Sequence, residues 1–186
     1  MLRFLAKTVL GIAAMIAASP LAIAATRPEK ENITGWNHFV WGAEVGGSID
    51  MTSNGLSSIN ADAYFGYKNA WIDAVGVGAS VNMMVNNSVR TYPVYALLRT
   101  DFSSGRGLVF MDLRGGIAIN NLTYSDTQTS LYLSPGIGFN LARGRSFCSY
   151  MTLSYIYNGL RPFDLGDHRC DVDGLSMACL RLGIRF

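Results

Sequence analysis

The stretch that decides the fold is Phe39–Met51, which reads FVWGAEVGGSIDM. Successive side chains of a strand point to opposite faces, so this segment would have one apolar and one polar face. The two faces would carry Trp41, Ala43, Val45, Gly47, Ile49 and Met51 on one side, and Gly42, Glu44, Gly46, Ser48 and Asp50 on the other. No amphipathic helix pattern follows that could cover the apolar face, and lipid is the natural cover. The stretch therefore predicts a strand of a transmembrane β-barrel.

Seven further segments with the same alternation follow, separated by turn residues such as Thr52-Ser53-Asn54-Gly55. The eight predicted strands are Phe39–Met51, Ser58–Tyr67, Trp71–Met83, Thr91–Arg99, Leu108–Asn120, Ser130–Asn140, Ser146–Tyr157 and Leu175–Phe186. Most are near the roughly 9–11 residues that a tilted membrane strand needs. We therefore predict an all-β fold, an antiparallel eight-stranded up-and-down transmembrane β-barrel over residues 38–186. Side chains should fill its interior and leave no open pore.

The first 24 residues have the features of a cleaved secretory signal peptide. Arg3 and Lys7 give a positive start, an apolar run follows, and Ala22-Ile23-Ala24 supplies a small-x-small cleavage pattern. Residues 25–37 are polar and unpatterned, and we expect them to form a periplasmic lead-in. After the leader no segment approaches ~18 consecutive apolar residues, which excludes a helical membrane protein. Lys and Arg do not cluster and the net charge is +2, so no nucleic-acid partner is expected.

The predicted outward positions support burial in lipid. No charge falls on them within the predicted strands, where a midplane Arg or Lys would cost roughly 2–4 kcal/mol. Outward aromatic residues collect near the strand ends, as in the two interfacial girdles of membrane barrels. The predicted girdles are Trp41, Phe65, Tyr67, Phe139, Phe147 and Phe186 at the periplasmic rim, and Tyr92, Tyr155 and Tyr157 at the outer rim. Pro135 occupies an outward strand position and removes a ladder donor, so we expect a bulge there.

Charged residues of the strands fall on the inward positions. The predicted lumen charges are Glu44, Asp62, Asp112, Arg99, Arg114, Arg181 and Arg185. Paired carboxylates could serve acid–base catalysis. We favour a structural salt-bridge network, because each desolvated charge needs an opposite partner. Glu44 and Asp112 should pair with the lumen arginines.

Other candidate sites are weaker. A barrel enzyme that modifies lipid A would need a Ser near a His, and Ser176 could approach His168, whereas His38 lies at the other end of the barrel. The run Asp167–Asp173 collects metal-ligand types without the spacing of a known site. We predict no catalytic, cofactor or metal site.

Three cysteines, Cys148, Cys170 and Cys179, allow at most one intramolecular disulfide. The pairing cannot be fixed from the sequence, and Cys170–Cys179 is one possibility.

Three segments resemble the OmpA/OmpX-like family of small outer-membrane β-barrels in Gram-negative bacteria: Gly46–Asp50, Tyr64-Phe65-Gly66-Tyr67 and the terminal Arg185-Phe186. The resemblance covers roughly residues 38–186 and implies localisation in the outer membrane after Sec-type export. It also implies contact with outer-membrane lipid and lipopolysaccharide, and that Phe186 is the signal read by the barrel-assembly machinery. Family members serve as structural barrels, adhesins or host-surface contacts.

The function expected from the sequence is a non-enzymatic outer-membrane barrel. It would be structural or would contact extracellular partners through its loops, above all the longest connection, residues 158–174. A lipid A-modifying enzyme, a soluble lipocalin-like carrier and a narrow channel remain as alternatives. A lipocalin-like carrier would have the inverse arrangement, with an apolar interior and a charged exterior.

Overall fold

The computed structural model describes residues 38–186 except for 53–54, 69–71, 87, 103–107, 123–126, 145–146, 165–168 and 171–173. The predicted signal peptide (1–24) and lead-in (25–37) lie outside the described residues. Among the described residues no helix is both long enough and apolar enough to cross a membrane.

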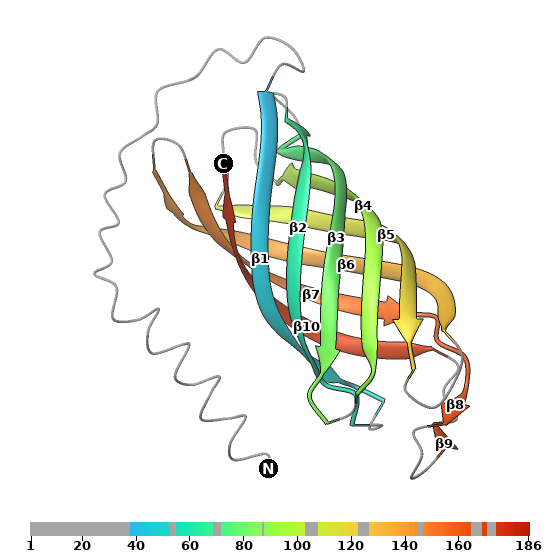
Figure 1. Cartoon of the computed structure of the whole chain (residues 1–186). Helices are drawn as coiled ribbons and strands as arrows, with labels where there is room; N and C mark the ends of the chain where they lie inside the picture. Colours follow the sequence, from blue (N-terminus) through green and yellow to red (C-terminus); the bar gives the residue numbers. More distant parts are fainter. Residues whose placement is uncertain are drawn as a thin grey trace. The chain divides into compact units, whose positions relative to one another are not determined.

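Eight long antiparallel strands close into one barrel, as predicted (Figure 1). The order round the barrel is β1-β10-β7-β6-β5-β4-β3-β2, so strands adjacent in the barrel follow one another along the chain and β10 closes onto β1. The strands are β1 (His38–Asp50), β2 (Ser58–Lys68), β3 (Ala74–Met84), β4 (Arg90–Asp101), β5 (Val109–Asn121), β6 (Gln128–Arg143), β7 (Cys148–Asn158) and β10 (Leu175–Arg185). We call the end where β1 begins and β10 ends the proximal end, and the opposite end the distal end.

Alternation of side chains is the physical basis of the barrel wall. Along β1, Val45 is 63% exposed whereas its neighbour Glu44 is 2% exposed, and the same alternation runs through the other long strands. Between the strand ends, the outward positions of the described strands carry no Asp, Glu, Lys or Arg. Arg90 and Arg143 are exposed, but they are the first residue of β4 and the last residue of β6. The wall is therefore apolar outside and polar inside.

The observed strand boundaries differ from those predicted by no more than two residues, except at the start of β3 and the end of β6, where the difference is three residues. β3 begins at Ala74 and not at Trp71, and Asp73, just before the strand, donates its backbone N–H to the Arg99 carbonyl of β4. β6 runs from Gln128 to Arg143, longer than predicted at both ends. Hydrophobic alternation does not mark these ends, because Ile72 is apolar but precedes β3, whereas Leu141 and Ala142 extend β6 beyond its predicted end.

The bulge predicted at Pro135 is wrong. Pro135 stands in regular register opposite Leu113 of β5. On the other side, pairing of β6 with β7 is interrupted at Ser134 and Pro135 without a change of register, because proline has no N–H to donate. The register shift lies further along, between Asn140 and Ala142.

The barrel closes between β1 and β10. Phe186 continues the pairing past the end of β10, because its N–H donates to the Trp41 carbonyl (2.9 Å) and its carbonyl accepts from the Trp41 N–H (3.3 Å). The two rings stack with centroids 4.5 Å apart. An aromatic pair on the outer wall therefore holds the closing seam at the proximal end.

The connection 158–174 contains structure that the sequence did not indicate. β8 (Phe163–Asp164) and β9 (Arg169–Cys170) pair as a short two-stranded sheet beyond the distal end of the barrel (Figure 1). Gly174, with φ of 101°, returns the chain to β10, and its N–H donates to the Leu160 carbonyl. The base of this connection is thus tied to the barrel.

Candidate functional site

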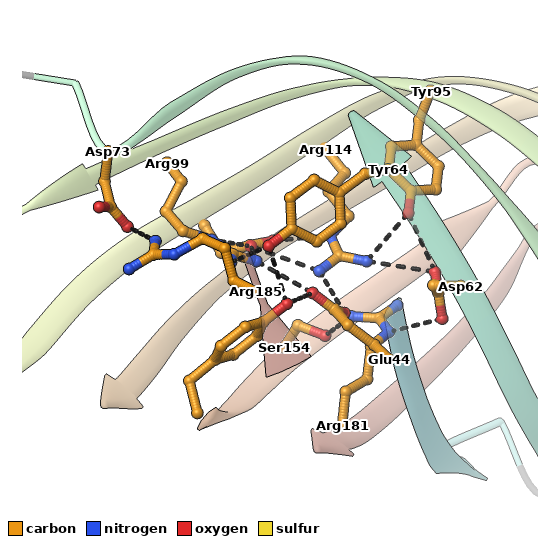
Figure 2. Close-up of polar contacts among 12 residues, drawn as sticks. Glu44, Asp62, Tyr64, Asp73, Tyr95, Arg99, Arg114, Ser154, Arg181 and Arg185 are labelled. Atoms are coloured by element: carbon orange, nitrogen blue, oxygen red, sulfur yellow. Dashed lines mark hydrogen bonds and ion pairs between the residues drawn. The ribbon is translucent and has the colours of Figure 1, made fainter. Parts of the chain in front are cut away.

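The centre of the lumen holds a cluster of buried ionic side chains, with Arg99 of β4 at one side (Figure 2). Its Nη2 lies 3.0 Å from Glu44 Oε1 and also pairs with Asp112, to which Nε donates at 3.0 Å. Aromatic rings surround the guanidinium, and its carbon lies 4.4 Å from the Tyr150 ring centroid and 4.7 Å from that of Phe110. Arg99 is therefore held by charge and by cation–π contacts in a site without water access.

Arg114 of β5 contacts three carboxylates. Its Nη2 lies 2.6 Å from Glu44 Oε2, its Nε 2.7 Å from Asp112 Oδ1, and its Nη1 3.1 Å from Asp62 Oδ1. Glu44 thus lies between Arg99 and Arg114, and Asp112 also contacts both. All four side chains of this core, and that of Asp62, are 0% exposed.

Arg181 of β10 completes the cluster. Its Nε lies 3.5 Å from Asp62 Oδ2, an ion pair longer than a hydrogen bond, while its Nη1 donates to Ser154 Oγ (2.7 Å) and its Nη2 to the Tyr132 hydroxyl (3.2 Å). Three guanidinium groups therefore face three carboxylates, and their formal charges cancel. A desolvated set of charges needs this balance, because an unpaired charge would carry the full desolvation cost.

Tyrosine hydroxyls link the charges. The Tyr150 hydroxyl donates to Glu44 Oε1 (2.6 Å) and lies 3.0 Å from that of Tyr64, which accepts from Arg99. The Tyr95 hydroxyl donates to Asp62 Oδ1 (3.2 Å). Sequence reasoning did not assign these tyrosines a role. Their inward parity was the available signal, and Tyr64 and Tyr95 share their strands with the lumen charges Asp62 and Arg99.

Large lumen side chains require glycine on the facing strand. A Cβ on Gly42 would lie 2.6 Å from the Tyr64 hydroxyl oxygen, and one on Gly183 2.5 Å from the Tyr150 ring. These glycines make room for the tyrosines that bind Glu44 and Arg99.

Arg185 lies apart from the cluster. Its Nη1 pairs with Asp73, which precedes β3, and both side chains are nearly buried (Figure 2). β10 and β3 are not neighbours in the barrel, so this pair crosses the proximal mouth. Arg185 lies in the lumen as the sequence predicts, but no role is predicted for Asp73, because the predicted strand begins at Trp71.

Distal to the charges, the lumen is lined by uncharged polar groups. Ser48 Oγ lies 2.6 Å from Ser58 Oγ, and Asn60 Nδ2 donates to Cys179 Sγ (3.6 Å). On the other side, Asn158 Nδ2 donates to Asn120 Oδ1 (2.8 Å).

Beyond this layer, the distal connections close the barrel. Each of the four contributes at least one side chain that is no more than 3% exposed, and we call this set the distal seal: Leu56, Val89, Leu122, Leu160 and Phe163. Asn86 Nδ2 donates to the Gly55 carbonyl of the neighbouring connection, and the Arg161 N–H donates to Oε1 of Gln128, the first residue of β6. The described part of the distal end is therefore covered by apolar side chains.

The thiols of Cys148 and Cys179 are both free and buried, so the Cys170–Cys179 disulfide is wrong for this structure. Cys148 lies near the proximal end, where its thiol donates to Asn140 Oδ1 (3.3 Å). Cys179 lies on β10 opposite Ser154. The two are held in different parts of the lumen wall.

The elements of the alternative enzymatic site are only partly described. Ser176 faces outward, and its Oγ lies 2.7 Å from the Tyr155 hydroxyl, while His168 lies outside the described residues. The Asp167–Asp173 run is mostly outside them as well. Among the described residues, no three His, Cys, Asp or Glu side chains are grouped as metal ligands. The described lumen thus offers ion pairing and packing.

The fold and lumen are those of the class of small eight-stranded barrels with an apolar outer wall. Among solved structures, that of Neisserial surface protein A (NspA) matches with a TM-score of 0.51 and 18% identity, and the match covers 79% of this chain and 95% of that chain. The structure of Ail, the attachment invasion locus protein of Yersinia pestis, in complex with the heparin analogue sucrose octasulfate, gives a TM-score of 0.33 at 17% identity, covering 80% and 96%. A scan against models of protein families gives no match, and a search of curated proteins gives none. The similarity to NspA shows a common fold.

Proposed function

We propose that this chain is a non-enzymatic integral protein of the bacterial outer membrane, with its distal end outside the cell. The observation that carries the proposal is the inside-out wall: apolar residues face outward between the strand ends, and three arginine and three acidic side chains are enclosed at the centre. A carrier of lipocalin type needs an apolar interior, and this lumen holds ion pairs instead. The buried charges and the distal seal also leave no place for a continuous wet path in the described lumen.

Contact with extracellular partners is assigned to the longest distal connection, residues 158–174. Its base is anchored by Leu160 and Phe163, and its middle forms β8 and β9 beyond the barrel. Loops on a rigid scaffold are where binding residues concentrate. The structural similarity to NspA, a Neisserial surface protein, supports such a location. Lipopolysaccharide and outer-membrane lipid would surround the wall, and the role of Phe186 in assembly stays a prediction.

An epitope-insertion experiment in a Gram-negative host tests the location and orientation. An epitope within residues 165–168 should be labelled by antibody on intact cells. The same epitope within residues 104–106, in the proximal connection between β4 and β5, should be labelled only after permeabilisation. The unaltered chain should remain in the membrane fraction after a urea wash. Recovery in the soluble periplasmic fraction, or labelling of both epitopes on intact cells, would refute the proposal.

Replacing residues 164–173 by a Gly-Ser linker tests the role of the connection. The replacement leaves Leu160 and Phe163 in place, so heat-modifiable gel mobility should be unchanged while any surface contact is lost. Loss of the folded band would instead assign a structural role to the connection.

A further inference from the structure

The outer wall has a groove of about 550 Å³ that none of the sites above uses. It crosses the wall from β5 over β6 and β7 to β10, with Phe102 at its proximal edge. Its lining is almost entirely apolar: Phe102, Met111, Leu113, Pro135, Gly136, Ile137, Leu153, Ser154, Tyr155 and Ala178.

The groove follows from an irregularity in the wall. Pro135 faces outward where the pairing between β6 and β7 is interrupted, and its ring reaches less far from the backbone than Leu or Ile would. Ala178 on β10 stands directly opposite Tyr155 of β7 and is also short. Between these small residues the groove reaches Gly136 and Ser154, whose positions face the lumen. Leu113, Ile137 and Leu153 form the higher sides.

We propose that this groove is a binding site for one acyl chain of a membrane phospholipid. The inference rests on the proposed membrane location. The groove lies in the uncharged part of the wall, where acyl chains are the surrounding medium. It extends over about 14 Å, three strand spacings of roughly 4.8 Å.

The dimensions and chemistry of the groove select this occupant over others. Ten residues line it, whereas a stable protein–protein interface needs roughly 20–30 residues on each side, so the groove is too small to be an interface with a second copy of the chain. Its lining carries no Asp, Glu, Lys or Arg to orient a polar ligand. An acyl chain would prefer this groove to the surrounding lipid because the concave wall offers it more dispersion contacts. The hydrophobic effect does not contribute, since the surrounding lipid is apolar as well.

Photo-crosslinking in vesicles tests the site. The full chain is inserted into dimyristoylphosphatidylcholine vesicles that contain a small fraction of phosphatidylcholine with a diazirine on one acyl chain, and the crosslinked peptides are mapped. Crosslinks should be enriched on β5, β6, β7 and β10 relative to their share of exposed wall. Ala178→Leu, which fills part of the groove, should lower crosslinking there at least about threefold, because several dispersion contacts of the chain are lost.

Ala79→Leu is the matched control, because Ala79 is an exposed outward alanine on β3, outside the groove. It should leave the crosslink pattern unchanged. Pro135→Leu is a second test in case Ala178→Leu fails to insert, and it should have the same effect as Ala178→Leu. Crosslinks spread evenly round the barrel, crosslinks to a second copy of the chain, or equal yields from all three variants would overturn the inference. Failure of the unaltered chain to insert would overturn the proposed membrane location itself.

Discussion

Replacement of Arg114 by methionine tests whether the lumen cluster holds the barrel together. Arg114→Met keeps much of the side-chain length and removes a guanidinium that contacts Glu44, Asp112 and Asp62 within 3.1 Å. Two guanidinium groups would then face three carboxylates in a lumen without water access.

The expected cost follows from that imbalance. Removing one partner of a buried ion pair typically costs 3–5 kcal/mol, because the remaining charge is left uncompensated. With an m-value of about 2 kcal/mol/M, the midpoint of urea unfolding should fall by about 1.5–2.5 M. Adding Glu44→Gln restores the charge balance, so the double variant should be more stable than the sum of the two single changes predicts, by about 0.5–3 kcal/mol.

Equilibrium urea unfolding in vesicles, followed by gel mobility without heating, measures these differences. Arg161→Met is the matched control, because Arg161 is exposed in the distal connection, and its replacement should change the free energy of unfolding by no more than about 0.5 kcal/mol. If Arg114→Met costs no more than this control, the reasoning about the lumen cluster fails. Strict additivity of Glu44→Gln and Arg114→Met would show that their ion pair contributes nothing.

Two further pairs of substitutions, each a test variant with its control, probe the inner and outer faces of the wall. Gly138→Ala would place a Cβ 2.0 Å from the nearest ring carbon of the fully buried Phe110 and should cost roughly 1–3 kcal/mol in urea unfolding. Gly115→Ala, whose Cβ would have its nearest neighbour at 3.6 Å, should be nearly neutral, and equal effects would contradict the packing described. Leu113→Arg puts a charge on the outward face within the strand and should cost roughly 2–4 kcal/mol, against about 0–1 for Asn121→Arg at the strand end. Equal costs in vesicles would argue against a lipid-facing wall.

Alternation along each strand made the barrel predictable. A period of two places Glu44 and Val45 on opposite faces whatever the neighbouring strand is, so the inside and outside of the wall could be assigned from the sequence. The start of β3 and the end of β6 could not be placed, because apolar residues lie both inside and outside the paired segments there and hydrophobic alternation does not show where backbone pairing stops.

The partners within the lumen depend on register, which no single strand encodes. Arg99 and Asp112 stand opposite each other on β4 and β5, a pairing that follows only once both strands are aligned. The contact between Arg185 and Asp73 spans the mouth between strands that are not neighbours, and the sequence offers no signal for it. The bulge predicted at Pro135 was wrong for a similar reason: the missing N–H interrupts pairing with β7, but the register is the same on both sides of the interruption.

The distal seal separates the ionic interior of the barrel from the exposed parts of the distal connections. Each distal connection has a buried apolar residue close to one of its strands, such as Val89 just before β4 or Leu122 just after β5. The sequence on the exposed side of these buried residues can be lengthened, shortened or exchanged without exposing the ionic interior. The architecture thus permits variation of the distal surface on an unchanged barrel. Peptides grafted into the distal connections, with the residues of the distal seal kept, should leave the barrel intact.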